Sequence, residues 1–171
     1  MKQLILILSL IATNASAQVS IGKAPPQVVI KGDDGGRTDG SAWDSSMIKG
    51  KVMSLFYVDP DEKDSNEILE SALGKEEFPK DKYQSIGIIN MDATWMPNFA
   101  IASALASKQE KYPDVIYVKD MKKVLVNKWG LKDDAYVVLI FNKAGELIHQ
   151  DSGVLDKART AAVVKKIKDN L

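Results

Sequence analysis

The stretch Lys51–Val58 reads KVMSLFYV and is apolar at every position but its first and fourth. Near-continuous apolarity over this length is typical of a strand buried on both faces, as in the centre of a parallel sheet. Asp59-Pro60 ends the strand, because proline lacks the N–H that a sheet ladder needs. The stretch therefore predicts a central strand whose carboxyl end opens into the acidic loop Asp59–Asp64, DPDEKD.

A helix is predicted directly after this loop. Asp64 can cap its first turn, and Glu67 three residues later would complete a capping box. Ile68 and Leu69, followed by Ala72 and Leu73, then recur on one helical face.

Beyond this helix the chain alternates between strands and helices and then turns into a hairpin. Strands are predicted at Ser85–Asn90, Val115–Val118, Tyr136–Phe141 and Glu146–Gln150, helices at Asn98–Lys111 and after the capping residue Asp156, and a short element at Val124–Trp129. Parallel strands need crossover helices, and a hairpin adds an antiparallel edge. The order predicts a thioredoxin-like three-layer α/β/α sandwich with a mixed sheet. A flavodoxin-like fold would continue with alternating helices instead.

The N-terminus has the pattern of a secretory signal peptide. Lys2 precedes the apolar run Leu4–Ala12, which is too short to span a membrane, and Ala15-Ser16-Ala17 forms a small-x-small cleavage site. We expect residues 1–17 to be removed and a soluble mature chain to reach the periplasm with no stable membrane anchor. Residues 18–50 are expected to form an extension with short strands around a turn at Asp33–Ser41, and residues 51–171 the thioredoxin-like domain.

Composition excludes several classes of function. The chain has no cysteine and one histidine, so thiol–disulfide exchange, peroxidase chemistry, iron–sulfur clusters and thiolate zinc sites are excluded. Removing Lys2 from the 23 basic residues leaves 22, against 23 acidic ones. This balance offers no basic surface for nucleic acid. No cofactor is expected.

Three stretches carry a more specific likeness: Phe78–Thr94, Lys111–Leu131 and Ala135–Leu155. Together they resemble the YtfJ family of exported, thioredoxin-like bacterial proteins, and the resemblance covers the chain from about Lys49 onward. It implies an exported location and a thioredoxin-like fold, but no substrate and no catalytic residues.

Both marks of thioredoxin-like redox proteins are replaced in this sequence. Such proteins carry their redox motif after the strand that corresponds to Lys51–Val58, where this chain has the acidic loop. They carry a cis-proline where Ala135 stands, and a cis bond at a non-proline residue costs about 2.5–4 kcal/mol. We therefore expect a trans peptide bond at Ala135.

Carboxylates make the acidic loop a weak candidate metal site. Asp59, Asp61 and Asp64 supply the oxygen ligands that Ca²⁺ and Mg²⁺ prefer, although their spacing does not match an EF-hand. Asp92 follows the next predicted strand and should lie at the same sheet edge. A metal-dependent enzyme at this edge is one hypothesis. The alternative is that Asp64 caps the helix and the other carboxylates favour its positive end.

The same edge carries Trp95 and Met96, residue types that are enriched in binding surfaces. One interpretation is a groove for a periplasmic protein or peptide, and the other is that both side chains pack in the core. His149 is expected to be structural, because Asp151 stands too close along the chain to orient it easily. The sequence thus favours a non-catalytic binding or envelope-maintenance role over the metal enzyme, with a purely structural envelope component as a third possibility.

Overall fold

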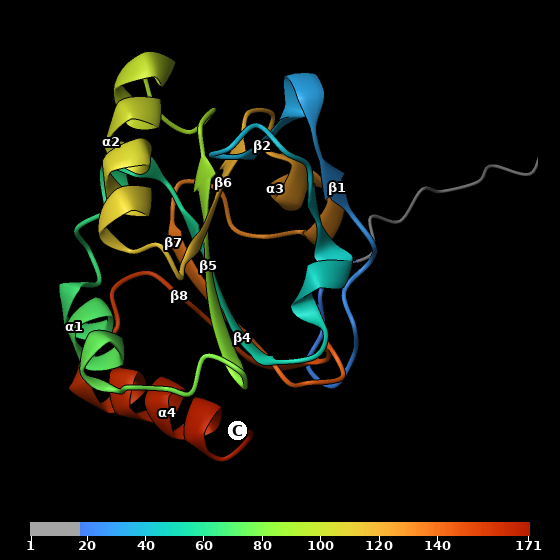
Figure 1. Ribbon diagram of the computed structural model, residues 1–171, viewed down its shortest axis with the longest axis vertical. Coiled ribbons are helices and arrows are strands. Elements are labelled where there is room, and N and C mark those ends of the chain that lie inside the picture. The colour runs from blue at the N-terminus through green and yellow to red at the C-terminus, as the bar shows by residue number, and fades with distance from the viewer. Residues whose placement is uncertain (1–17) are drawn as a thin grey trace, which may run out of the picture.

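The computed structural model describes residues 18–171 (Figure 1). The predicted signal peptide lies outside the described residues. A six-stranded sheet has the order β2-β6-β5-β4-β7-β8. Its strands are β2 (Gly35–Arg37), β4 (Val52–Val58), β5 (Tyr83–Asn90), β6 (Ile116–Asp120), β7 (Tyr136–Phe141) and β8 (Leu147–Ser152), and the helices are α1 (Glu67–Lys75), α2 (Asn98–Lys111), α3 (Val124–Trp129) and α4 (Lys157–Lys168).

Strand β4 occupies the centre of the sheet, as its sequence predicted. All of its residues are buried. It runs parallel to β5 and antiparallel to β7, so that Leu55 lies between Ile86 and Leu139. The parallel β4-β5-β6 unit and the β7-β8 hairpin form the mixed sheet of a thioredoxin-like α/β sandwich.

Different layers cover the two faces of the sheet. Helices α1, α2 and α4 lie on one side in Figure 1, and α3 and the N-terminal segment lie on the other. Alternate residues of β4 contribute to the two cores. Phe56 packs on the side of helices α1 and α4, and Leu55 packs on the opposite side with Trp43 and Trp129. This alternation follows from the two-residue period of a strand.

The N-terminal segment is anchored on the sheet by tryptophans. Strands β1 (Val29–Ile30) and β3 (Trp43–Asp44) pair with each other. The rings of Trp43 and Trp129 meet edge to face at 6.1 Å, and Trp129 Nε1–H donates to the Pro26 carbonyl at 2.8 Å. Apart from β2, which joins the main sheet, residues 18–50 thus contribute to the layer over one face of that sheet.

The interpretation of Asp33–Ser41 as a continuous turn is wrong, because Gly35–Arg37 forms β2 and pairs antiparallel with β6. Gly35 has φ 118°, and a Cβ there would stand 1.9 Å from the Lys119 carbonyl oxygen. Glycine is therefore required for close approach of two strands. The same residue type also marks turns, which explains the error.

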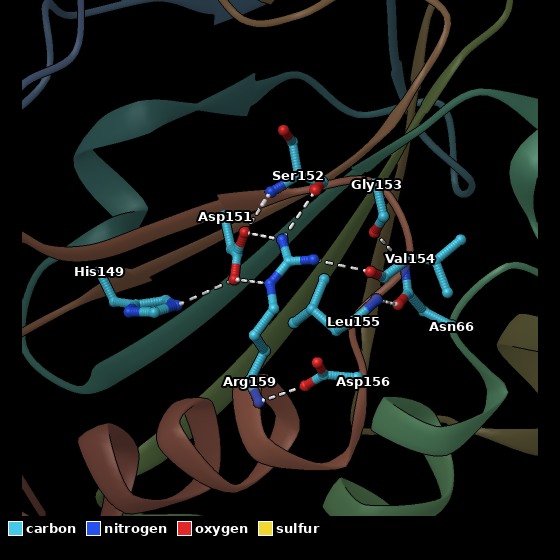
Figure 2. A network of polar contacts seen from close by, with 9 residues as sticks. All are labelled: Asn66, His149, Asp151, Ser152, Gly153, Val154, Leu155, Asp156 and Arg159. Atoms are coloured by element: carbon cyan, nitrogen blue, oxygen red, sulfur yellow. Dashed lines mark hydrogen bonds and ion pairs between the residues drawn. The ribbon is translucent and has the colours of Figure 1, made fainter.

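The predicted cap of α1 is also wrong. The helix begins at Glu67, and Asp64 instead forms an exposed ion pair with Lys63 at 3.1 Å. The N-cap residue Asn66 makes no capping bond. Its buried amide donates to the Gly153 carbonyl at 2.9 Å and accepts from the Leu155 N–H at 2.8 Å (Figure 2). Tertiary bonds to the β8–α4 connection have replaced the local cap.

The start of α4 is held by the polar network in Figure 2. Asp156 accepts from the Arg159 N–H at 2.8 Å and caps the helix as predicted. The Arg159 guanidinium binds both carboxylate oxygens of Asp151. It also donates to the carbonyls of Val154 and Ser152, at 2.7 and 2.9 Å. The network joins the end of β8 to the first turn of α4.

Candidate functional site

The loops that follow β4 and β5 meet at one edge of the sheet, as the parallel arrangement predicted. The Thr94 hydroxyl donates to the Asp61 carboxylate at 3.0 Å, and the Met96 N–H donates back to the same hydroxyl at 3.2 Å. This bonded pair of loops, residues 59–66 and 91–97, is called the β4/β5 edge below.

Asp59 is the buried carboxylate of this edge, with only 4% of its surface exposed. It accepts from the Asp61 N–H at 2.8 Å and caps the 3₁₀ turn Pro60–Glu62. Its own N–H donates to the Ala135 carbonyl at 3.1 Å. Burial raises the pKa of Asp59, although the Asp61 N–H opposes this effect. The carboxylate thus shapes the loop that stands at the position of a redox motif.

Ala135 lies beside this turn with a trans peptide bond, as expected, since residues 18–171 contain no cis bond. Asp134, immediately before it, has φ 49°. A left-handed backbone is uncommon for a residue with a side chain, although Asp tolerates it better than most. The loop before β7 therefore contains a left-handed residue and a trans peptide bond in place of a cis-proline.

The acidic residues do not form a metal centre. Within residues 18–171 no group of three carboxylate or imidazole side chains is placed to hold a metal ion. Asp59 bonds to its own turn, Asp61 to Thr94, and Asp64 to Lys63. Asp92 is exposed. The hypothesis of a metal-dependent enzyme at this edge is therefore unsupported.

A buried hydrogen-bond network underlies the edge, and no local sequence pattern indicates it. Asp120, fully buried at the end of β6, accepts from the Tyr57 hydroxyl at 3.1 Å. It also accepts from the backbone N–H groups of Val124 and Leu125, at 2.8 and 3.0 Å. Burial, with the added effect of Asp120, raises the pKa of Tyr57. The carboxylate fixes the start of α3 beneath the sheet.

A second polar cluster reaches the surface beside it. Asp133 accepts from the Asn90 amide at 2.8 Å and pairs with Lys123 at 2.7 Å. Burial opposes ionisation of Asp133, but the bonds from Lys123 and Asn90 outweigh it and lower the pKa of the carboxyl. Lys123 is thus a partner in a structural ion pair.

Two aromatic side chains, one on the β4/β5 edge and one just after it in α2, project into solvent. Trp95 is 90% exposed and Phe99, in the first turn of α2, is 79% exposed. The interpretation of Trp95 as a core residue is therefore wrong, while Met96 is half-buried. Sequence reasoning missed Phe99. The only available signal for the exposure of Phe99 was its position two residues before Ile101. That position lies off the helix face that Ile101 and Leu105 bury.

His149 lies apart from the edge, on β8 (Figure 2). Its Nε2 is 4.0 Å from an Asp151 carboxylate oxygen, so the two side chains do approach each other despite their closeness in sequence. Burial lowers the pKa of His149, and Asp151 partly compensates. Because Arg159 already binds both carboxylate oxygens of Asp151, we interpret the contact between His149 and Asp151 as structural.

Comparison with known proteins places this geometry in a family. The family model described as a bacterial protein of unknown function, YtfJ_HI0045, matches residues 15–170.

The chain belongs to the YtfJ family.

It is similar to the uncharacterized protein YtfJ of Escherichia coli K12, with 27% identity over 132 residues, covering 75% of this chain and 70% of that protein. The likeness to YtfJ extends the resemblance first seen in three separate stretches of sequence.

Solved structures agree on the fold of this member of the YtfJ family. A Bacteroides thetaiotaomicron protein described as a candidate disulfide isomerase superposes with a TM-score of 0.64 at 15% identity, covering 90% of this chain and 91% of that one. The thiol peroxidase of Chromobacterium violaceum gives a TM-score of 0.64 at 11% identity, covering 90% and 89%. At these identities the likeness shows the thioredoxin-like fold alone, and this chain has no cysteine.

Proposed function

We propose that this YtfJ protein is exported to the periplasm and acts there as a non-catalytic binding protein, with the β4/β5 edge as its contact surface. It would recognise a protein or peptide partner, and its role would be either binding of that partner or maintenance of the cell envelope. The signal-peptide pattern of residues 1–17 supports export. No helix among residues 18–171 is long and apolar enough to cross a membrane. The lack of cysteine excludes thiol chemistry at this edge.

The exposure of Trp95 and Phe99 carries this proposal. An indole that is 90% exposed gains little from the hydrophobic effect in the free protein. Tryptophan is also among the residues that contribute most to binding energy when a partner covers it. The hydrogen bond between Thr94 and Asp61 holds the loop that carries Trp95, so less conformational freedom is lost on binding.

The charge of the edge suggests the chemistry of the partner. Asp64 and Asp92 are both exposed there, and Asp61 faces the loop of Trp95 through Thr94. A partner segment with an apolar or aromatic side chain flanked by basic residues would match this surface, because opposite charges steer association.

The experiment is an affinity capture from periplasmic extract under native conditions. The wild-type protein is compared with the double variant Trp95→Ala/Phe99→Ala and with a control, Val154→Ala, which removes another exposed apolar side chain. A partner retained by wild type and control but lost by the double variant supports the proposal. Failure to recover a reproducible partner, or equal recovery by all three proteins, would overturn it. Thermal melting confirms that the variants are folded.

Export is tested separately by cell fractionation and N-terminal sequencing. We expect the protein in the periplasmic fraction with Gln18 as its first residue. An intact N-terminus in the cytoplasmic fraction would refute this part of the proposal.

A further inference from the structure

A cavity of about 690 Å³ lies between α1 and α2, over the sheet face that these helices cover. Its size falls within the usual range of small-molecule sites, about 300–1,000 Å³. Its lining includes neither Trp95 nor Phe99, so it is distinct from the binding edge proposed above.

Aromatic rings form much of the lining. They come from all four strands β4–β7 and from the end of α2: Phe56, Tyr83, Tyr112, Tyr117 and Tyr136. Phe56 and Tyr136 lie with ring centroids 6.0 Å apart.

A glycine allows one of these rings to lie over the sheet. In register, Gly87 stands between Phe56 and Tyr117. A Cβ at Gly87 would meet two ring atoms of Tyr117 at 3.1 Å, closer than an unperturbed ring would allow. The absence of a side chain at Gly87 therefore lets the Tyr117 ring lie across β5 as part of the cavity floor.

A carboxylate faces these rings. The Tyr136 hydroxyl donates to Glu70 Oε1 at 3.2 Å, which fixes the carboxylate on the α1 wall. Burial raises the pKa of Tyr117 to about 12, and the charge of Glu70 adds to the effect. Glu70 thus lies close enough to Tyr117 and Tyr136 for its charge to help raise the pKa of both hydroxyl groups.

The lining carries three further charged side chains besides Glu70. Glu67 also lines the cavity, together with Lys63 and Lys108. Lys63 is already paired with Asp64 at 3.1 Å. The lining thus contains two carboxylates and two ammonium groups, and one of these ammonium groups, that of Lys63, also pairs with Asp64 outside the lining.

We propose that this cavity binds a small organic cation, an amine or quaternary ammonium compound with an apolar body. The cationic group would lie against the Tyr117 ring beside Glu70, since a ring face and a carboxylate both attract positive charge. The apolar body would cover Phe56 and Gly87. One ring of the lining already binds a cation within the chain, because Lys111 Nζ lies 5.1 Å from the Tyr112 ring centroid.

The test uses phenyltrimethylammonium as the probe and benzenesulfonate as an anion of similar size. Titrations followed by amide chemical shifts report both affinity and location. We expect the cation to bind and to shift the amides of Ser85 and Gly87. Glu70→Gln keeps an acceptor for Tyr136 but removes the charge, and should weaken binding about threefold to fivefold. Tyr117→Leu should weaken it by a similar factor. The Trp95→Ala/Phe99→Ala variant should bind as the wild type does, which separates this site from the edge.

Several results would overturn the proposal. They are equal or stronger binding of benzenesulfonate, an unchanged affinity in Glu70→Gln, shifts confined to residues outside the cavity, or no binding of the cation. The Glu70 side chain is on an exposed position of α1, so this variant should fold normally, as a melting curve can verify.

Discussion

Removal of one hydroxyl group should measure how strongly the buried network supports the β4/β5 edge. Tyr57 is 1% exposed and donates to Asp120, which is fully buried, at 3.1 Å. Tyr57→Phe keeps the ring and deletes this bond. Since a hydrogen bond to a charged group contributes about 1.5–3 kcal/mol, we expect the free energy of unfolding to fall by about 2 kcal/mol. In a domain of this size that corresponds to a drop in Tm of about 4–8 °C.

Tyr136→Phe is the matched control. Its hydroxyl donates at 3.2 Å to Glu70, whose residue is exposed, so water can replace the lost donor and we expect a loss below about 1 kcal/mol. Urea denaturation followed by tryptophan fluorescence measures both variants, because Trp43 and Trp129 are buried in the core. A loss for Tyr57→Phe that is below about 0.5 kcal/mol, or no greater than that of Tyr136→Phe, would refute the reasoning, provided that the denaturant slope is unchanged.

Other predictions concern titration and backbone strain. Burial lowers the pKa of His149, so below about pH 6.5 the unfolded chain binds a proton at this residue more readily than the folded chain does. Urea denaturation should therefore show that the wild type loses stability from pH 7 to pH 5. The same profile should be flatter for His149→Asn. The hydrogen bond from Arg159 lowers the pKa of Asp151, so its contribution should be present above about pH 4 and be lost as the pH falls through the folded pKa. Asp151→Asn should therefore destabilise the protein more at pH 7 than at pH 3 in urea denaturation, whereas equal losses at both would exclude this cause. Gly35→Ala meets the Lys119 carbonyl at 1.9 Å, whereas Gly40 has φ 84° with open space around it; we expect Gly35→Ala to cost at least about 1 kcal/mol more than Gly40→Ala in thermal melts, and equal costs would show that β2 adjusts freely.

Much of the fold was predictable because its longest elements have strong patterns. Three patterns were located correctly: the apolar run of β4, the four-residue spacing of the buried side chains Ile101 and Leu105 in α2, and the six apolar residues of β7. Short elements were harder. The glycines of β2 indicate a turn by composition, and only the spatial closeness of Lys119 reveals a strand.

The candidate site was less predictable because its bonds join distant parts of the chain. Tyr57 and Asp120 are separated by 63 positions, and no local pattern connects them. Asp64 has the right type and spacing to cap α1, but three-dimensional bonds to Asn66 determine where the helix begins. For Trp95 the sequence left core packing, suggested by the usual burial of its type, and an exposed binding surface both open, and only the structure shows that the side chain is exposed.

The amide of Asn66 has a consequence for the order of folding. It joins the start of α1 to Gly153 and Leu155, which lie 87 and 89 positions later in the chain. Contacts of such long sequence separation close late, because the intervening chain must first lose its freedom. We therefore expect the loop between β4 and α1 to reach its final shape only after the β8–α4 connection has docked. A partner that recognised this loop would discriminate between complete molecules and those whose C-terminal segment is truncated or still unfolded.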